Sequence, residues 1–580
     1  MIMIFILGLP LLLALGGFHR RLRPLLVSLA PWSALPALVW ALTNPPHSVY
    51  EIPWLFIGIH LGLDDVGRSV IIVTALVWML AGISARESFV SGATSHRVFI
   101  VYLVTLTGMF GLSLAQDLPT FTLFYAFLTF AAYGLIIVEQ TVTAHRAGLA
   151  YLILAVVGEI LLLEAVLHIM FIAGNHNISQ IPAVVATASE RHLIIGLLLA
   201  GFGIKIGVFP LHVWIPMAYS ATPIAISAVL SGSMFMAGFL GWMRLLPLGM
   251  IALPEWGLVC MIAGTMTLLY GIGIGLTQKN AKTLLAYSTI SQAGLLTTGF
   301  GMGMVMPDQW SHIAKLMVLW PMHHAIAMGS LFLGLGVARK TAGTVWQHQL
   351  VAVGLVVSAL ALIGVPISSG ALNKGIFEIT ALPMTTWTAL LSWLPALGTL
   401  GMSLLMGRFL IEAWPWRQDK GIQPEKRLTM GVWLPWIALL VCDGLMMWVM
   451  RLTLSAETES LLWSPMAIMA NLWPIVIGGL FIWGMIRMFD DFPTFSVPPG
   501  DLVVGIERLA NRTQAGWKGI TGETWQAWRR DLASHPLLHK SRSLASSIIE
   551  EMEGALSQWM TLGATFLFLV AMFFFLLLAT

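Results

Sequence analysis

The sequence predicts an all-α protein that crosses a membrane many times. Its 580 residues are 58% hydrophobic and only 10% charged, whereas a soluble domain carries about 25% charged residues. Apolar segments of roughly 20 residues, the length that spans a bilayer, follow one another as far as about residue 490. Two of these segments carry Gly and Pro beside a lysine. We therefore expect about 16 transmembrane helices with two inverted repeats, each containing a broken helix, plus an amphipathic lateral helix near the C-terminus.

Sixteen apolar segments are candidate spans. They cover residues 2–17, 24–43, 66–85, 98–116, 119–138, 147–172, 192–210, 219–245, 251–276, 283–305, 314–338, 347–378, 385–413, 430–453, 467–488 and 559–579. The first segment carries its basic residues, Arg20, Arg21 and Arg23, behind its apolar core. A cleaved signal peptide has the opposite order, so we expect a retained helix with the N-terminus outside.

Basic residues gather in every second loop, as expected for loops on the inner side of a membrane. The predicted inside loops contain Arg20, Arg21, Arg23, Arg86, Arg97, Arg146, Lys279, Lys282, Arg339, Lys340, Arg417, Lys420, Lys426, Arg427 and Arg487. The predicted outside loops contain Glu51, Asp64, Asp65, Asp117, Glu457 and Glu459, with Arg191 as an exception. This alternation supports the count of spans and indicates a multi-pass protein of the inner (plasma) membrane.

The spans group into six regions along the chain. They are the N-terminal transmembrane helices 1–97, repeat one 98–245, repeat two 251–413, additional transmembrane helices 414–495, an amphipathic segment 496–558 and a last transmembrane helix 559–580. Segment 496–558 is rich in charge, and its tryptophans interleave with Lys and Arg. Such a segment is typical of a helix on the membrane surface, here on the cytoplasmic side. The alternative is an inside loop with two short helices and no role.

The composition also argues against several classes of function. The net charge of +3 is too small to indicate nucleic-acid binding. Cys260 and Cys442 lie in apolar segments, and the sequence contains no CxxC and no Cys/His cluster that would hold zinc or an iron–sulfur centre. We expect no cofactor and no metal in this chain, and the lipid bilayer as its surroundings.

Two lysines lie inside predicted spans, where a charge is costly and usually functional. Lys205 lies between Gly203 and Pro210, and Lys374 follows a Gly364–Gly370 stretch that contains Pro366. Gly and Pro interrupt a helix and expose backbone groups that can hold water or ions. When the predicted spans are counted along the chain, the two interrupted spans cross the membrane in opposite directions. This arrangement indicates an inverted repeat.

Carboxylates and histidines near these lysines could move protons. Burial disfavours the charged form of lysine and a nearby carboxylate favours it, so changing their separation would change the lysine's protonation. Histidines such as His168, His323 and His324 titrate near neutrality. The candidate proton-pathway residues are Lys205, Lys374, Glu159, Glu164, His212, His324 and Glu378. Buried Lys–Glu pairs can also be purely structural, His212 could only cap its break, and Asp443 is expected to pack or line a pore.

Several ordered stretches resemble one family of membrane subunits. Phe209–Pro223 is similar to its "FPLHxWLPxAxxxxP" pattern, Lys282–Gly294 to "KRxLAYSSISQxG", His324–Leu333 to "HAxFKxLLFL", and Gly364–Lys374 to "GIPPxxGFxxK". The family is that of the antiporter-like subunits of respiratory complex I, Mrp cation/proton antiporters and membrane-bound hydrogenases. The resemblance covers roughly residues 60–413 and implies a proton-pathway role within a complex of several membrane subunits.

Within that family the sequence combines features of two branches. The Ala225–Arg244 stretch resembles the D-type Mrp subunit, and the inside segment before the last span resembles the largest antiporter-like subunit of complex I. Several ionisable positions of the family are lost. Its fifth-span glutamate falls at Ala126, its eighth-span lysine at Met236, and its eleventh-span histidine and lysine at Trp320 and Met328. The aspartate of "DxKR" is Asn280.

Three functions follow as hypotheses. The first is a proton- or cation/proton-translocating subunit of a multi-subunit complex, with any redox centre in a partner because this chain has no cofactor motif. The second is a membrane scaffold with a partly inactive channel, which the lost ionisable residues favour. The third is the membrane half of an inorganic-carbon uptake complex, which the family resemblance also allows.

Overall fold

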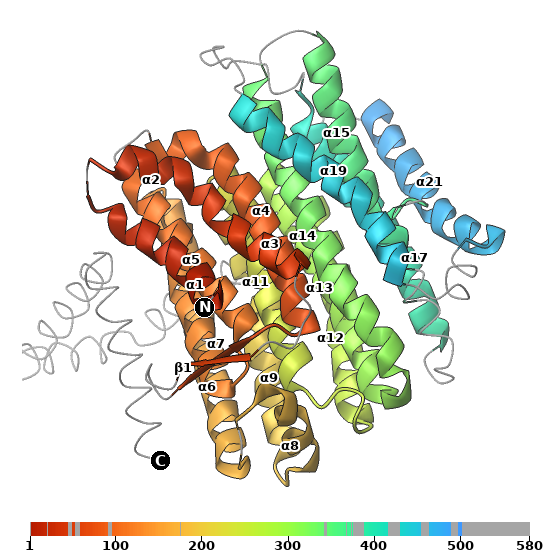
Figure 1. The fold of residues 1–580 in the computed structure, drawn as a ribbon. Coiled ribbons are helices and arrows are strands. Elements are labelled where there is room, and N and C mark those ends of the chain that lie inside the picture. The colour runs from red at the N-terminus through yellow and green to blue at the C-terminus, as the bar shows by residue number, and fades with distance from the viewer. Residues whose placement is uncertain are drawn as a thin grey trace, which may run out of the picture. The chain divides into compact units, whose positions relative to one another are not determined.

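The chain forms a bundle of long helices that run side by side (Figure 1). The computed structural model describes residues 2–19, 21–43, 49–52, 58–90, 95–174, 176–341, 345–366, 368–372, 374, 377, 388–415, 430–453, 463–488 and 497–500. By its contacts the chain divides into two units, residues 1–52 with 58–499 and residues 53–57 with 500–580. All elements named below belong to the first unit.

The N-terminal half begins with helices and one short hairpin. Its elements are α1 (Ile2–Gly16), α2 (Arg23–Leu29), η1 (Ala30–Ala34), α3 (Leu35–Thr43), β1 (Val49–Ile52), β2 (Ile59–Gly62), α4 (Asp65–Val90), α5 (Ser95–Leu114), α6 (Leu118–Ile136), α7 (Val142–Ile172), η2 (Ile178–Gln180), α8 (Ile181–Thr187), α9 (Arg191–Ile206), α10 (Trp214–Ala221) and α11 (Ile224–Leu245). The antiparallel β1–β2 pair, with Val49 opposite Gly62, is a feature that the all-α prediction did not contain.

In the described residues of the second half, all regular elements are helices. Its elements are α12 (Pro254–Leu276), α13 (Ala281–Val305), η3 (Pro307–Gln309), α14 (Trp310–Lys340), α15 (Val345–Ile363), α17 (Thr388–Ala413), α19 (Met430–Thr453) and α21 (Pro465–Met488). Twelve helices in the described part are long and apolar enough to cross a membrane. This confirms a multi-span helical protein, while the number sixteen stays a prediction. The predicted segments 496–558 and 559–580 lie outside the described residues, apart from 497–500.

Short polar side chains fix where several helices begin. The Asp117 carboxylate accepts a hydrogen bond from the Thr120 backbone N–H (2.7 Å) at the start of α6. Thr141 accepts from Ala144 N–H (3.1 Å) at the start of α7. Asn280 accepts from Lys282 N–H (2.9 Å) at the start of α13. Each satisfies a backbone donor that the first turn of a helix leaves free, and Asn280 does so where the family pattern has aspartate.

Three predicted spans are interrupted in the structure. The predicted segment 192–210 ends as a helix at Ile206, and 347–378 ends as a helix at Ile363. Segment 219–245 overlaps two helices, α10 and α11, that meet at Thr222 and Pro223. The physical reason is the same each time, because Gly and Pro do not continue a helix.

The ends of α9 and α15 share one backbone geometry. Gly207 (φ +91°) and Gly364 (φ +86°) follow these helices in the left-handed region, which glycine adopts without strain. At the first break the N–H groups of Gly207 and Val208 both donate to the Gly203 carbonyl. At the second, the N–H groups of Gly364 and Val365 both donate to the Leu360 carbonyl. A proline follows shortly after each glycine, so both breaks end a helix by the same local chemistry.

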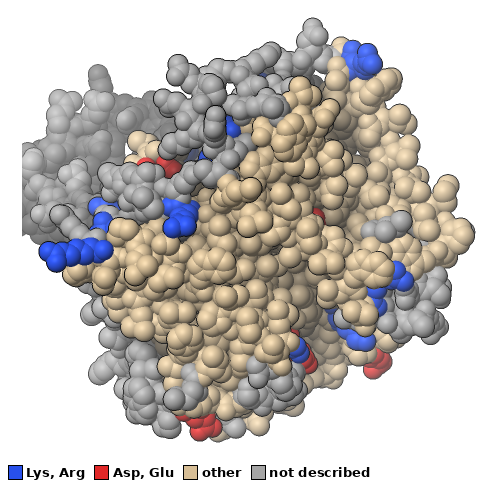
Figure 2. Space-filling view, turned by 45° about the horizontal axis from the view of Figure 1, so that its top comes forward, with Lys and Arg blue, Asp and Glu red and all other residues tan. Residues whose placement is uncertain are grey.

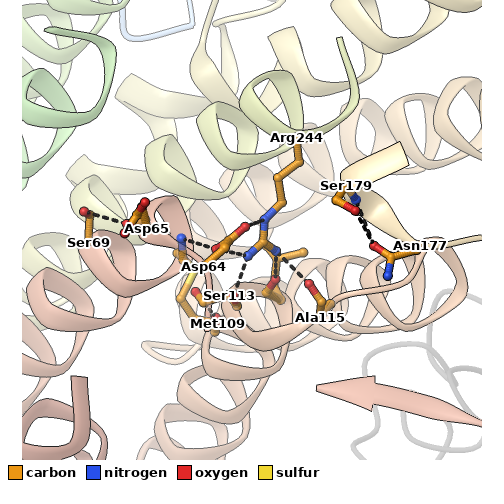
Figure 3. Close-up of polar contacts among 11 residues, drawn as sticks. Asp64, Asp65, Ser69, Met109, Ser113, Ala115, Asn177, Ser179 and Arg244 are labelled. Carbon is orange, nitrogen blue, oxygen red and sulfur yellow. Dashed lines mark hydrogen bonds and ion pairs between the residues drawn. The ribbon is translucent and has the colours of Figure 1, made fainter. Parts of the chain in front are cut away.

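A buried arginine ties several elements together at one end of the helices. The Arg244 guanidinium pairs with both oxygens of Asp64 (2.7 and 3.1 Å) and donates to the carbonyl groups of Leu112, Ser113 and Ala115 (Figure 3). Asp64 precedes α4, the three carbonyls end α5, and Arg244 lies in the last turn of α11. Bidentate geometry and several carbonyl acceptors suit the planar guanidinium. Arg244 therefore joins the ends of three helices.

The surface suits a bilayer. On the face shown in Figure 2, charged side chains gather mainly near the margins, and a wide band between them is almost free of Lys, Arg, Asp and Glu. Large apolar side chains are exposed on several helices, including Ile153 and Ile160 of α7, Val259 of α12, Trp448 of α19 and Leu480 of α21. A protein with so much exposed apolar surface would aggregate in water, whereas the same surface is stable in lipid.

Candidate functional site

The amine of Lys205 lies in a polar cluster formed by α6, α7 and α9. Lys205 is in the last turn of α9 and is only 3% exposed. Its Nζ donates to the Thr129 hydroxyl (2.7 Å) and to the Tyr151 hydroxyl (2.9 Å). A buried lysine amine needs such acceptors because it has lost its contacts with water.

Thr129 connects this amine to a carboxylate. The Thr129 hydroxyl lies 2.6 Å from Glu159 Oε1, while its oxygen accepts from Lys205. The same hydroxyl also lies 2.9 Å from the Tyr125 carbonyl; since it has one proton, it donates to either the carboxylate or the carbonyl. When it donates to Glu159, an unbroken hydrogen-bonded chain runs from amine to hydroxyl to carboxylate.

Aromatic side chains hold the lysine from both sides. Lys205 Nζ lies 5.1 Å from the centre of the Tyr125 ring and 5.3 Å from that of Tyr151. At these distances the ring faces attract a cation. Tyr151 also donates to the Thr129 carbonyl (3.0 Å), and Trp214 packs edge-on against the Tyr151 ring (5.1 Å between centres). Trp214 is the first residue of α10, the helix that follows the first break, so α10 packs against the cluster through this ring.

Glu164 and His168, from the same helix as Glu159, lie in a different cluster. His168 Nε2 is 3.1 Å from Glu164 Oε1, and His168 Nδ1 is 2.7 Å from Glu190 Oε2. The Glu164 and Glu190 side chains are more than half exposed. The structure thus pairs Lys205 with Glu159, and the pathway role of Glu164 stays a prediction.

The second broken span carries a comparable set of groups. Lys374 is buried and its amine donates to the Ile363 carbonyl at the end of α15. Ser369, beyond the break, hydrogen-bonds His323 Nδ1 on α14 (2.6 Å). Asp443 of α19 places Oδ1 3.9 Å from the same His323 nitrogen. Lys374 also lies within electrostatic range of His323, so a lysine, a serine, a histidine and a carboxylate lie together.

The remaining predicted site residues are placed as follows. His212 is buried in the first break, where its ring lies against Phe209 and Tyr270 (5.8 and 4.6 Å between centres). His324 is buried on α14 against Phe235 (5.1 Å). Neither ring has a hydrogen-bond partner on its nitrogens within the described part of the chain. Glu378 lies outside the described residues.

Neutral side chains occupy the lost ionisable positions of the family. Met236 of α11 and Met328 of α14 are buried, and the Met328 sulfur lies 3.8 Å from the Ser288 hydroxyl. Trp320 donates its indole N–H to Gln292 (2.9 Å). Three positions where the family carries titratable groups therefore hold packed, neutral side chains.

Polar residues of these clusters that were not predicted as site residues include Thr129, Tyr151 and Asp443. Thr129 lies three residues beyond Ala126, on the same face of α6, so the loss of the glutamate could have directed attention to it. Tyr151 had no signal in the sequence. Asp443 was recognisable as a charge within a span, but only the structure places it beside His323.

Comparisons with known proteins agree with this architecture. The family model for the transmembrane region of NADH:quinone oxidoreductase and Mrp antiporter subunits matches residues 115–399. A D-type Na(+)/H(+) antiporter subunit from Alkalihalophilus pseudofirmus is 26% identical over 406 residues, 67% of this chain and 80% of the relative. The NAD(P)H-quinone oxidoreductase subunit 2 of Synechococcus elongatus is 30% identical over 377 residues, 62% of this chain and 70% of the relative.

A solved structure shows the same fold. The Mrp complex from Dietzia sp. superposes with a TM-score of 0.73 at 19% identity, and the match covers 96% of this chain and 63% of the compared chain. The order of elements, the two glycine breaks and the buried lysines, together with the sequence matches, lead to one assignment. The chain belongs to the family of membrane subunits that NADH:quinone oxidoreductases and Mrp antiporters share.

Proposed function

We propose that this chain is a proton-translocating subunit, or a cation/proton-translocating one, of a complex with several membrane subunits. The observation that carries the proposal is the hydrogen-bonded chain from the buried Lys205 Nζ through the buried Thr129 hydroxyl to Oε1 of the half-buried Glu159, with steps of 2.7 and 2.6 Å. A purely structural ion pair would favour direct contact of amine and carboxylate. A hydroxyl between them, which both accepts and donates, allows a proton to pass.

The transfer step conserves every proton. The ammonium of Lys205 gives one proton to the Thr129 oxygen while the Thr129 hydroxyl gives its own to Glu159. The products are a neutral amine, an intact hydroxyl and a neutral carboxylic acid. Burial makes this neutral pair comparable in energy to the charged pair, because a low-dielectric environment disfavours both charges. A small change in separation between α7 and α9 would then decide where the proton lies.

The second lysine extends this proposal to the other half of the chain. Lys374 lies at a glycine break of the same geometry as that beside Lys205. Met236, Trp320 and Met328 are neutral at positions where the family carries titratable groups, so we propose that each half exchanges protons on its own. His212 and His324 would serve as additional steps, and Glu164 and Glu378 as outer groups.

The same parallel supports two inverted repeats at 98–245 and 251–413, within a total of about 16 spans. The matching breaks at Gly207 and Gly364 are the physical support for the repeats. The alternation of basic and acidic loops supports an N-terminus on the outside. We also propose that segment 496–558 lies on the cytoplasmic side and contacts neighbouring subunits.

The relatives favour translocation over the alternatives. They are named as subunits of Na(+)/H(+) antiporters and of quinone oxidoreductases, and the solved relative is part of an Mrp complex. A scaffold with an inactive channel would not need the hydrogen-bonded Lys205–Thr129–Glu159 chain. If the chain were the membrane half of an inorganic-carbon uptake complex, it would co-purify with a single soluble partner.

The first experiment is purification from the native membrane in mild detergent, followed by mass spectrometry. Antiporter-like subunits without redox proteins would support cation/proton exchange, and hydrogenase or quinone-reductase subunits would support a redox-driven pump. The complex is then reconstituted into liposomes with a trapped pH-sensitive dye, and proton flux is followed under a potassium diffusion potential.

Flux should fall strongly in Glu159→Gln and in the double variant Lys205→Ala, Lys374→Ala. Asp308→Asn serves as the matched control, because this carboxylate lies exposed in η3. Wild-type flux in the double lysine variant would exclude both lysines from the pathway. A wild-type complex without proton flux would support the scaffold alternative.

A further inference from the structure

A cavity between α15 and α19 contains a carboxylate that the established family features leave without a role. Its volume is about 210 Å³, and its lining includes Val357, Leu360, Pro366, Ser369, Asp443 and Gly444. Val357 and Leu360 are exposed on their outer side, as is Gly444. The cavity therefore reaches from the second helix break to the side of the bundle.

The carboxylate of Asp443 lies buried at this cavity. The residue is 3% exposed, and neither of its oxygens has a hydrogen-bond partner among the described residues. The Ser358 hydroxyl faces it and shares a hydrogen bond with Ser330 (2.7 Å). Even when Ser330 is the donor in that bond and Ser358 turns its proton to the carboxylate, one oxygen is left without a partner, and a buried carboxylate oxygen without a hydrogen bond is costly. The cavity has room for several water molecules, since one water needs about 10–15 Å³ of such space, and waters here would satisfy the oxygens.

Asp443 also lies one short step from the second lysine cluster. Its Oδ1 is 3.9 Å from His323 Nδ1, which is hydrogen-bonded to Ser369 (2.6 Å). The 3.9 Å gap is too long for a hydrogen bond and can be closed by a small side-chain movement or bridged by one water. Lys374 and His323 interact electrostatically, so the groups form a series from cavity to carboxylate, histidine and lysine.

The two halves then correspond in composition. In the first half a lysine at a glycine break reaches a carboxylate of α7 through Thr129. In the second half a lysine at a glycine break lies near a carboxylate of α19, with His323 and Ser369 between them.

We propose that Asp443 is the proton-exchange carboxylate of the second half and that the cavity, covered at its mouth by a neighbouring subunit rather than by lipid, is its hydrated entrance. A proton enters through water, binds Asp443, and passes to His323 as the carboxylate releases it. His323 then passes a proton on towards Lys374 and returns to its neutral form. This inference rests on the proposed function of proton translocation.

The first test compares proton flux in liposomes that contain the native complex with Asp443→Asn, Asp443→Glu and the exposed control Asp308→Asn. Asparagine keeps the shape and removes the proton site, so flux through the second half should fall on the order of a hundredfold. To isolate that half, each variant is also made with Glu159→Gln. Glutamate should retain measurable flux. Flux in Asp443→Asn with Glu159→Gln equal to that of Glu159→Gln alone would overturn the proposal.

The second test measures whether water reaches the cavity. A side chain added at Gly444 meets no atom within 4 Å, and the same is true of Gly479 on α21. Both are exposed. In a background with Cys260 and Cys442 replaced by Ser, Gly444→Cys should react with a charged methanethiosulfonate reagent and Gly479→Cys should not. The reaction at position 444 should also reduce flux. If the Gly444→Cys thiol were as unreactive as the Gly479→Cys thiol, the cavity would be dry. That result would overturn the proposal that the cavity is a hydrated entrance.

The outcomes separate this inference from the proposed function. If the wild-type complex moves no protons, the proposed function fails and the Asp443 inference fails with it. If the wild type moves protons and Asp443→Asn with Glu159→Gln moves them as fast as Glu159→Gln alone, only the inference fails. Folding of each variant is checked by its assembly with the other subunits on a native gel.

Discussion

The Thr129 hydroxyl links Lys205 to a carboxylate on a neighbouring helix, although the glutamate of the family is absent from α6. The family's glutamate position is Ala126, and the carboxylate that remains, Glu159, is on the neighbouring helix α7. Thr129 lies between that carboxylate and Lys205, within 2.7 Å of both. A lysine and a carboxylate therefore still lie together here, although the carboxylate comes from another position in the sequence.

Replacing Thr129 tests this bridge directly. Thr129→Val keeps the shape and removes the hydroxyl, so the hydrogen bonds to both charged groups are lost. Hydrogen bonds to charged groups contribute about 1.5–3 kcal/mol each, so proton flux through the first half, measured with Asp443→Asn also present, should fall roughly ten- to hundredfold. Thr129→Ser should restore most of it. The proton-transfer role of Thr129 is refuted if the valine variant with Asp443→Asn transports as fast as Asp443→Asn alone in the liposome assay.

Asp64 is expected to matter for stability rather than for transport. Asp64→Asn leaves the Arg244 guanidinium buried with carbonyl acceptors only. Breaking a fully buried pair costs about 3–5 kcal/mol, and because the Asp64 side chain is 31% exposed we expect about 1–3 kcal/mol. Thermal unfolding in detergent, followed by tryptophan fluorescence, should shift down by a few degrees. The neighbouring exposed Asp65→Asn is the control, and equal shifts for both would contradict the anchoring role of the pair.

At the scale of elements, the broken helices depend on glycine. A side chain at Gly207 would collide with Ile215, and one at Gly364 would lie 3.1 Å from the Lys374 amine. Both positions have positive φ, which costs other residues of order 1–3 kcal/mol. The break therefore sets both the end of the helix and the position of the lysine.

Gly364→Ala and Gly207→Ala should reduce stability and flux together. Gly273→Ala on α12 is the matched control, because an added Cβ there meets nothing within 4 Å. In that ordinary helical position alanine is favoured over glycine by about 1 kcal/mol. Unfolding temperature and flux are measured for all three. If the alanine variants at the breaks behave like Gly273→Ala, the breaks do not need glycine.

For the whole molecule, the apolar faces must lie in lipid or against other membrane subunits. Ile160 of α7 is 61% exposed and Val142, at the start of the same helix, is 86% exposed. An arginine within the hydrocarbon region costs about 2.5–3.5 kcal/mol on insertion scales. Ile160→Arg should therefore lower the amount of assembled complex, whereas Val142→Arg, near the basic residue Arg146, should be tolerated. Native gels of membrane extracts measure this, and equal yields would place Ile160 outside the bilayer.

Much of the fold could be predicted because membrane spans obey simple rules. The predicted segments 98–116, 119–138 and 430–453 correspond closely to α5, α6 and α19, since a span needs about 20 apolar residues whatever surrounds it. Helix interruptions near Lys205 and before Lys374 were also predictable, because Gly and Pro act locally. The β1–β2 hairpin was missed, since its apolar and polar residues are too few to form a pattern.

The many membrane-spanning helices and the lysines in two broken spans could be predicted from the sequence alone, because hydropathy and the backbone preferences of Gly and Pro are local properties. Which polar groups meet could be seen only in the folded chain. Thr129, Tyr151 and Glu159 reach Lys205 from other helices, and Asp443 reaches His323 from a helix about 120 residues away. Such contacts depend on how the helices pack and rotate, and side chains far apart in the chain carry no mark of that arrangement in their own neighbourhood.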